Sequence, residues 1–421
     1  MSTDTTTTQA DPPTTAPAGP GIAQAWSDYV AQLRGGQLGS LPAILGLVAL
    51  VALFTALKGD VFFTVFNLAN LLQQSAMVMV IAMGLVFVLL LGEIDLAAGY
   101  TAGTSGAVMG VTLTQKGWAW PLAVIACIVT GMLVGTVMGL LVARLKIPSF
   151  VVTLSFFLAL QGAMLLIIGD GGTIPIRDET ILKIQNGNLP IWAGWALMVL
   201  VVGGYAAQTF LARRARIARG LPVASNAVWL LKLAALGVPA IVATALLNGE
   251  RSLRPAIISI RGVPIIVPVI AVLLIVLTFV LARTAFGRHV YAVGGNAEAA
   301  RRAGINVARI RVTCFIIGAT MAAVAGVLFA SKDASISPST GGSSTLLYAV
   351  GAAVIGGTSL FGGRGRVSDA VFGGLVVAVI GNGLPLITQE SGIQLGVTGL
   401  VLLVAAGVDA LSRSRSAATG V

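Results

Sequence analysis

The sequence has very few of the residues that build metal centres and disulfide frameworks. Its 421 residues include one histidine, His289, and two cysteines, Cys127 and Cys314, which both lie inside apolar runs. One histidine excludes a multi-histidine metal site, and two cysteines in apolar surroundings argue against a disulfide framework or a metal cluster. We therefore expect no metal site on this chain.

Charged residues are scarce as well. They make up 10% of the chain, against 57% hydrophobic residues, whereas a soluble domain carries about 25% charged residues. Such a chain cannot cover its surface with polar groups, so lipid must be the solvent for much of it. The formal net charge of +11 agrees better with basic cytoplasmic loops of a membrane protein than with nucleic-acid binding.

The two ends of the chain differ from the middle. Residues 2–20 are rich in Thr, Pro, Ala and Asp, and this composition cannot build a core. They also lack the basic start, apolar stretch and cleavage site of a signal peptide. We interpret 1–40 as a disordered or interfacial cytoplasmic tail with a short interfacial helix at 22–38, and 413–421 as a cytoplasmic C-terminal tail.

The region 41–412 reads as an all-α, polytopic transmembrane helical bundle, because a spanning helix needs about 20 mostly apolar residues. The Gly- and Thr-rich third segment is the one that we expect to be broken. The twelve predicted spans are 41–58, 70–91, 94–114, 119–143, 149–169, 190–211, 226–247, 265–283, 312–331, 344–361, 367–387 and 395–412.

The distribution of basic residues predicts a cytoplasmic N-terminus. With twelve spans, most of the 26 basic residues fall in inner loops, as the positive-inside rule requires. Eight basic residues fall in outer loops, and the weakest point of the assignment is the outer segment 248–264, which holds three of them, Arg251, Arg254 and Arg261. An alternative with ten spans treats 226–264 as an interfacial excursion and keeps the same orientation elsewhere.

Glycine marks three places in the apolar region. Gly131, Gly135 and Gly139 recur every fourth residue, a spacing that predicts a packing face for a neighbouring helix. The stretches 92–110 and 351–374 are rich in glycine and interrupted, one in each half of the chain. Paired broken segments can mark a translocation pathway, and tight helix packing explains them equally well.

Two acids, Glu93 and Asp95, lie between apolar spans. A charge at the bilayer centre costs about 3 kcal/mol on insertion scales, so acids there serve a site or meet a partner. At a helix start, however, an acid is stabilised by unsatisfied N–H groups and the helix dipole. Asp95 is therefore either a capping residue, which we favour, or a substrate contact.

The longest polar segment between spans is the predicted inner loop 284–311. Asn296 is a good N-cap, the following stretch AEAARRA favours a helix, and Gly304 supplies its end. Glu298 falls in the first turn and two arginines in the last, the signs that a helix dipole prefers. The short helix is either a connector along the membrane or a docking site for a cytoplasmic partner.

This loop resembles the EAA…G loop of ATP-binding-cassette (ABC) importer permeases, in which it docks on the ATPase subunit. The resemblance assigns ATPase coupling to seven residues, which are Asn296, Glu298, Ala299, Ala300, Arg301, Arg302 and Gly304. The Ile-x-Leu-Pro that follows the glycine in many members is missing here, a departure shared with ribose- and xylose-type sugar permeases.

Further blocks resemble the same sugar permeases over about 350 residues. Ala97 replaces the usual serine in the first of them. The blocks are Gly92–Gly99, Lys146–Phe150 with Thr153, Leu154 and Gly162, Phe286–Gly304, Ile355–Leu360, Gly362–Gly365 and Asn382–Leu384. Glu93 and an inserted segment at 220–264 are similar to the xylose branch.

The resemblance implies a permease subunit in a bacterial plasma (inner) membrane that moves a monosaccharide, D-xylose in the first place. It also implies an ABC ATPase, an extracellular or lipid-anchored sugar-binding protein, and a homodimer of permeases. The segment GGTSLFGGRG lacks the Gly-Lys-Ser/Thr ending of a phosphate loop. ATP and magnesium therefore belong to the partner, and this chain is no enzyme.

A neutral sugar offers hydroxyl groups, which polar side chains within the spans can meet. The predicted substrate path holds Asn70, Gln73, Glu93, Asp95, Thr153, Gln161 and Asn382. Each is alternatively an interhelical hydrogen bond worth about 0.6 kcal/mol. Rival functions are a permease of the same family for ribose, another sugar or a branched-chain amino acid, and an ion-coupled secondary transporter that uses Glu93 and Asp95.

Overall fold

The computed structural model describes residue 27 and residues 41–169, 172–221, 223, 225–252, 256–257 and 259–418. Apart from Ser27, the predicted tail 1–40 and its interfacial helix lie outside the described residues. The described part of the chain is predominantly helical, as predicted, with a single pair of two-residue strands.

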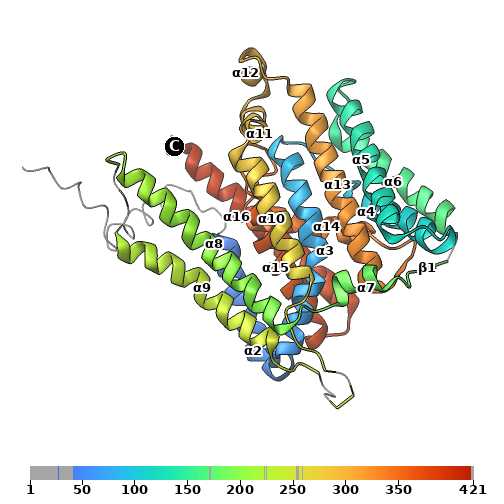
Figure 1. Ribbon diagram of the computed structural model, residues 1–421. Coiled ribbons are helices and arrows are strands. Elements are labelled where there is room, and N and C mark those ends of the chain that lie inside the picture. The colour runs from blue at the N-terminus through green and yellow to red at the C-terminus, as the bar shows by residue number, and fades with distance from the viewer. Residues whose placement is uncertain are drawn as a thin grey trace, which may run out of the picture. The chain divides into compact units, whose positions relative to one another are not determined.

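The elements follow one another in the order shown in Figure 1. They are α2 (Leu41–Phe62), α3 (Val65–Leu90), α4 (Ala98–Gly110), the π-helix η1 (Val111–Gln115), α5 (Trp120–Ala143), α6 (Ser149–Ile168), β1 (Ile174–Pro175), α7 (Glu179–Asn186), α8 (Ile191–Ile217), α9 (Asn226–Asn248), α10 (Ile266–Arg283), α11 (Ala285–Gly295), α12 (Ala297–Arg302), α13 (Val307–Asp333), β2 (Ser335–Ile336), α14 (Ser343–Gly356), α15 (Val367–Ile387) and α16 (Ser391–Ala418).

All twelve predicted spans coincide with helices, although their lengths differ. Within the described residues, nine helices are long and apolar enough to cross a membrane, and they include both α8 and α9. The predicted span 94–114 is shorter than expected, because α4 begins only at Ala98 and gives way to η1 at Val111. The predicted span 344–361 is also too long, since α14 ends at Gly356 and Gly357 has a positive φ of 120°.

Helix α13 begins earlier than the predicted span 312–331. Asn306 caps it by accepting a hydrogen bond from the Arg309 amide at 3.0 Å, so the helix starts at Val307. Together with α3 it is the most buried of the long helices, and it packs against α3, α4 and α5. The α3–α13 pair therefore forms the centre of the bundle.

The glycine row on α5 faces α13, which confirms the predicted packing face. A Cβ added at Gly135 would lie 2.6 Å from the Phe315 carbonyl oxygen and 2.7 Å from the Ala319 Cβ. A Cβ at Gly131 would lie 2.6 Å from the Ala319 carbonyl oxygen. Only glycine permits this separation of the two helix backbones.

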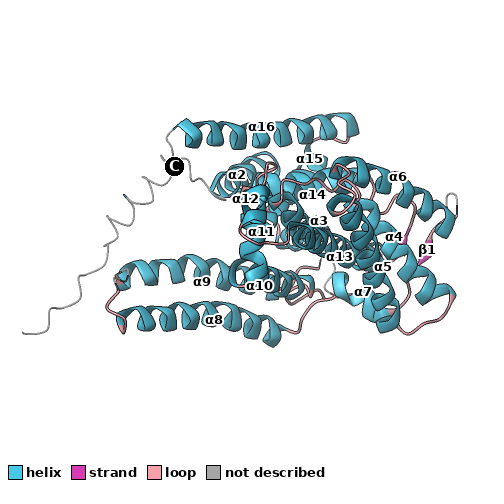
Figure 2. Ribbon diagram, turned by 90° about the horizontal axis from the view of Figure 1, so that it is seen from above, coloured by secondary structure: helices cyan, strands magenta, loops and turns pink. Residues whose placement is uncertain are grey.

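Two compact units make up the chain. In the described part, one comprises Trp192–Leu246, and the other comprises the residues from Leu41 to Ile191 and from Leu247 onward. In the first, α8 and α9 run side by side as a hairpin (Figure 2). The Trp229 indole on α9 donates to Thr209 Oγ1 on α8 at 2.9 Å, which holds the two helices in register.

In the second unit, the described residues of the segment 249–262 neutralise part of the positive charge of this loop. Arg261 Nε lies 2.9 Å from Glu250 Oε2. Arg251 is buried and donates to Asn188 Oδ1 at 2.9 Å and to the Gly262 carbonyl oxygen at 2.8 Å. Basic residues in this predicted outer loop thus have local partners; Arg254 lies outside the described residues.

Candidate functional site

The predicted inner loop 284–311 folds into two helices, α11 and α12, where the sequence predicted one. Thr284 begins α11 by accepting a hydrogen bond from the Gly287 amide at 3.2 Å. Asn296 then caps α12 by accepting from the Ala299 amide at 2.9 Å, as predicted. We call residues 285–302 the α11–α12 unit; Figure 1 shows it at one end of the bundle.

Helix α12 carries its charges in the predicted positions. Glu298 lies in the first turn, and its carboxylate is 2.9 Å from Arg301 Nη1 and 3.4 Å from Arg302 Nε. The helix ends before Gly304, whose φ is +83°. All three charged side chains are more than half exposed, and exposed ion pairs contribute less than about 1 kcal/mol each. They therefore remain available to a partner.

The opposite side of the α11–α12 unit is buried. Val290 and Val293 of α11 and Ala300 of α12 belong to the main hydrophobic core. The unit thus has one face fixed in the protein and one charged face in solvent.

The end of α11 lies against the end of α3. At Gly294 an added Cβ would overlap the Leu90 carbonyl oxygen and lie 2.9 Å from the Gly363 amide nitrogen. The Gly363 amide in turn donates to the same Leu90 carbonyl at 2.8 Å. The α11–α12 unit, the last residue of α3 and the loop 357–366 therefore meet at one point.

The loop 357–366 also leads directly into α15. Tyr291 of α11 donates its hydroxyl to the Gly365 carbonyl oxygen at 2.7 Å. The Asp369 carboxylate accepts from the Arg366 amide at 2.7 Å and from Thr358 Oγ1 at 3.3 Å. The Asp369 carboxylate thus occupies the start of α15. In a phosphate loop, the corresponding position at a helix start binds phosphate.

The segment 91–97 between α3 and α4 is linked to its neighbours by both predicted acids. Glu93 Oε1 lies 3.1 Å from Arg311 Nε of α13, and both side chains are mostly buried. The Asp95 carboxylate accepts from the Ala97 amide at 2.8 Å, immediately before α4. The sequence did not predict that Glu93 pairs with Arg311.

Thr153 of the predicted path lies beside this same segment. Its fully buried hydroxyl is 2.9 Å from the Ser149 carbonyl oxygen and 3.2 Å from that of Ile94. The Ile94 amide donates to Ser149 Oγ at 3.2 Å. Thr153, Glu93 and Asp95 are therefore close to the α11–α12 end of the bundle.

Other predicted path residues gather near the start of α3 and the end of α15. Asn382 and Asn67 exchange two amide hydrogen bonds of 2.8 and 3.0 Å, and Asn382 Nδ2 lies 3.5 Å from Gln74 Oε1. We call these three residues the amide cluster. Asn70 and Gln73 are half-buried on the same half of α3, and Gln161 is half-buried on α6.

One buried polar residue that contacts this half of α3 from the neighbouring helix α7 was not predicted from the sequence. Gln185 of α7 is fully buried, and its Nε2 donates to the Gln73 carbonyl oxygen. Its Oε1 is buried without a hydrogen-bond partner. Helix α7 starts with Asp178 as N-cap, and this is the sequence feature that could have shown a short helix here.

The structure is a bundle of membrane-spanning helices with the α11–α12 unit at one end and polar residues inside. Residues 67–406 match the family described as "Branched-chain amino acid transport system / permease component". The chain belongs to this family and is a multi-pass protein of the plasma membrane.

Several characterised relatives cover almost the whole chain. The xylose transport system permease protein XylH of Escherichia coli K12 is 35% identical over 373 residues, which are 89% of this chain and 92% of the relative. XylH of Haemophilus influenzae is 33% identical over 88% of this chain and 96% of the relative.

A ribose permease shows lower identity. The ribose import permease protein RbsC of H. influenzae is 28% identical over 87% of this chain and 92% of its own length. No solved structure matches the chain. The resemblance to sugar permeases, and to the xylose branch within them, is confirmed.

Proposed function

We propose that the chain is the membrane subunit of an ATP-driven importer of D-xylose, which an extracellular or lipid-anchored binding protein delivers. One observation carries the proposal: the α11–α12 unit, α3 and the loop 357–366 meet at one point, where the Gly363 amide donates a hydrogen bond to the Leu90 carbonyl oxygen. A separate ABC ATPase would bind the exposed face of α12 and supply ATP and magnesium. Two permease chains would form the pore.

The contacts suggest how closure of the ATPase would reach the sugar. Helix α3 ends at the α11–α12 unit, and α15 begins after the loop that contacts it. The same two helices carry the amide cluster near their other ends. Displacing α12 would therefore move Asn67 and Asn382 against each other, and neutral amides are suitable partners for sugar hydroxyls.

The rival secondary transporter would use Glu93 or Asp95 to carry an ion. Glu93 is already bound to Arg311, and Asp95 to a backbone amide. The ion pair of Glu93 supports the ATP-driven proposal. Asp95 satisfies only one of its two carboxylate oxygens, since Oδ2 is buried without a hydrogen-bond partner.

Reconstitution tests the proposal. Proteoliposomes that contain the chain, the co-expressed ATPase and the binding protein should take up xylose only with ATP, and a protonophore should have no effect. Glu298→Lys should abolish uptake and the stimulation of ATPase activity, because it reverses the charge on the docking face.

Glu179→Lys is the matched control for that variant. Glu179 is also an exposed acid in a first helical turn, paired with Lys183 at 2.9 Å, but on α7. Its reversal should leave ATPase stimulation unchanged. Uptake without the ATPase, or an equal loss of ATPase stimulation in Glu298→Lys and Glu179→Lys, would overturn the proposal. Uptake of ribose but not of xylose would correct only the identity of the substrate.

A further inference from the structure

The α8–α9 hairpin concentrates positive charge around its turn. Residues 192–246 contain no Asp or Glu. All five basic residues of the hairpin fall within 213–232, and they are Arg213, Arg214, Arg216, Arg219 and Lys232. Residues 192–212 and 233–246 carry no charge at all, so the charge lies at one end only.

The length of α8 places this charge at a membrane surface. A helix rises 1.5 Å per residue, so about 20 residues cross a hydrocarbon core of about 30 Å. Counted from Ile191, the opposite surface is reached near Phe210, and the arginines follow in the next turns. Phe210 and Trp229 lie at this level, where aromatic side chains are enriched in membrane proteins.

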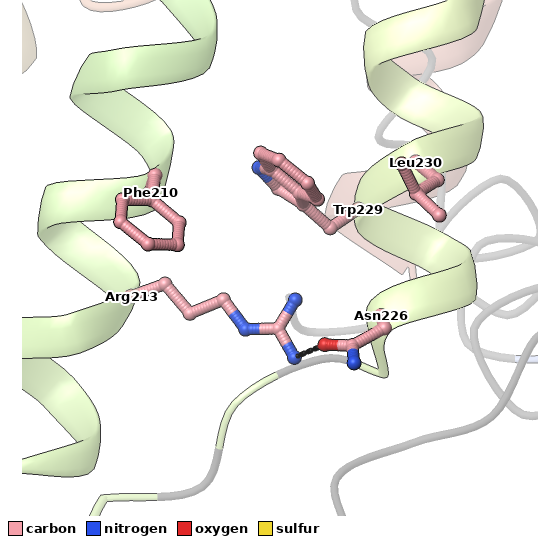
Figure 3. A pocket seen from close by; sticks show the side chains of 5 residues that line it. All are labelled: Phe210, Arg213, Asn226, Trp229 and Leu230. Atoms are coloured by element: carbon pink, nitrogen blue, oxygen red, sulfur yellow. Dashed lines mark hydrogen bonds between the residues drawn. The ribbon is translucent and has the colours of Figure 1, made fainter.

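A pocket of about 270 Å³ opens between the two helices at this depth, lined by Phe210, Arg213, Asn226, Trp229 and Leu230 (Figure 3). Aromatic and aliphatic side chains form its walls. The polar groups come from Arg213 on α8 and Asn226 on α9, and both point into the same space. The pocket therefore combines an apolar wall with a cation.

Neighbouring contacts hold the pocket in shape. The Trp229 indole donates to Thr209 Oγ1 at 2.9 Å, and its ring centroid lies 6.3 Å from that of Phe210. Arg214 stacks on Phe210, with its guanidinium carbon 4.7 Å from the ring centroid. Arg213 donates one N–H to Asn226 Oδ1, and a guanidinium has five such donors.

We propose that this pocket binds the phosphodiester headgroup of an anionic phospholipid such as phosphatidylglycerol. Arg213 donates to the phosphate oxygens as a fork, a geometry that suits guanidinium and phosphate. Leu230 and Phe210 contact the start of the acyl chains. The absence of acids from the hairpin favours an anionic lipid over a zwitterionic one.

The test is lipid binding to the full-length protein in detergent, measured by native mass spectrometry. Phosphatidylglycerol should bind at least about tenfold more tightly than phosphatidylcholine, and Arg213→Gln should remove about tenfold of that affinity, as expected for a charge-assisted hydrogen bond. Arg219→Gln is the control, because Arg219 carries the same charge two residues beyond the end of α8 and does not line the pocket. It should change the affinity less than about twofold.

A second, nearly isosteric variant keeps the test valid if Arg213→Gln fails to fold. Asn226→Asp places a carboxylate beside Arg213, so it should displace phosphatidylglycerol while the protein remains folded. Equal binding of both lipids, or equal losses in Arg213→Gln and Arg219→Gln, would overturn the proposal in favour of diffuse attraction. Inorganic phosphate should not compete at equal concentration; if it did, the pocket would be a soluble-phosphate site and the lipid proposal would be wrong.

Discussion

Arg311 Nε lies 3.1 Å from Glu93 Oε1 and so joins the beginning of α13 to the segment that follows α3. The Arg311 side chain is 27% exposed and that of Glu93 14%, so water screens this pair less than the ion pairs of α12. The two most buried long helices are thus linked by a charge pair beside the α11–α12 unit.

Breaking this pair should destabilise the protein. Glu93→Gln should lower the free energy of unfolding by about 1–3 kcal/mol, because Arg311 loses its charged partner. The double variant Glu93→Arg with Arg311→Glu should recover part of that loss. Thermal unfolding in detergent gives the double-mutant cycle, and additive effects of the single variants would show that the pair contributes nothing.

The contact of Gly294 with Leu90 predicts a steric effect at the α11–α12 unit. Gly294→Ala places a Cβ on the Leu90 carbonyl oxygen, so it should destabilise the protein by about 1–3 kcal/mol and weaken ATPase stimulation. The neighbour Gly295 has no atom within 4 Å of an added Cβ. Gly295→Ala should therefore be neutral, and equal effects of the two variants would contradict the assigned contact.

The α5–α13 packing face predicts a second glycine pair. Gly135→Ala brings a Cβ to 2.6 Å from the Phe315 carbonyl oxygen and should cost about 1–3 kcal/mol in unfolding free energy. Gly162 of α6 has open space around an added Cβ. Gly162→Ala should be neutral or stabilising by up to about 1 kcal/mol, from helix propensity alone. Unfolding temperatures in one detergent compare the two.

The loop 249–262 should be sensitive to acid. A hydrogen bond from the Ser259 hydroxyl, followed by those from the Ser252 and Ile260 amides, lowers the pKa of Glu250 from 4.5 to about 2. A lowered pKa in the folded state means that the stabilisation is complete above pH 4.5 and is lost as the pH falls toward 2. The loop should therefore loosen across this interval.

Hydrogen exchange at the Ile260 amide measures that loosening. Its protection factor should fall between pH 4.5 and pH 2 in the natural sequence. In Glu250→Gln protection should be low and independent of pH over the same interval. A protection factor that stays constant in the natural sequence would show that the carboxylate does not hold the loop.

The sequence predicted α12 well because all of its determinants are local. The N-cap Asn296, the charges of the first and last turns and the terminal Gly304 lie within nine residues, and each acts on its own helix end. The glycine row on α5 was predictable for a similar reason, since a period of four residues defines one face. The partner helix, α13, was not predictable from that period.

Contacts between segments that are distant in the chain could not be predicted from the sequence. The Glu93–Arg311 pair depends on how α3 packs against α13, and nothing near either residue indicates the other. The predicted path residues also looked alike as isolated polar positions, yet the structure places Thr153 beside Ile94 and Asn382 beside Asn67. Their separation into two groups follows from the direction in which each helix runs.

The amide cluster joins α3 to α15, and each of these helices also has an end at the α11–α12 unit. Thermodynamic linkage is reciprocal between two such sites. Under the proposed coupling, a solute that separates Asn67 from Asn382 changes the affinity of the α12 surface for its partner, and the partner changes the affinity for the solute by the same factor. The same two helices would then transmit solute binding to the α12 surface as well as transmit the conformational change that moves the solute.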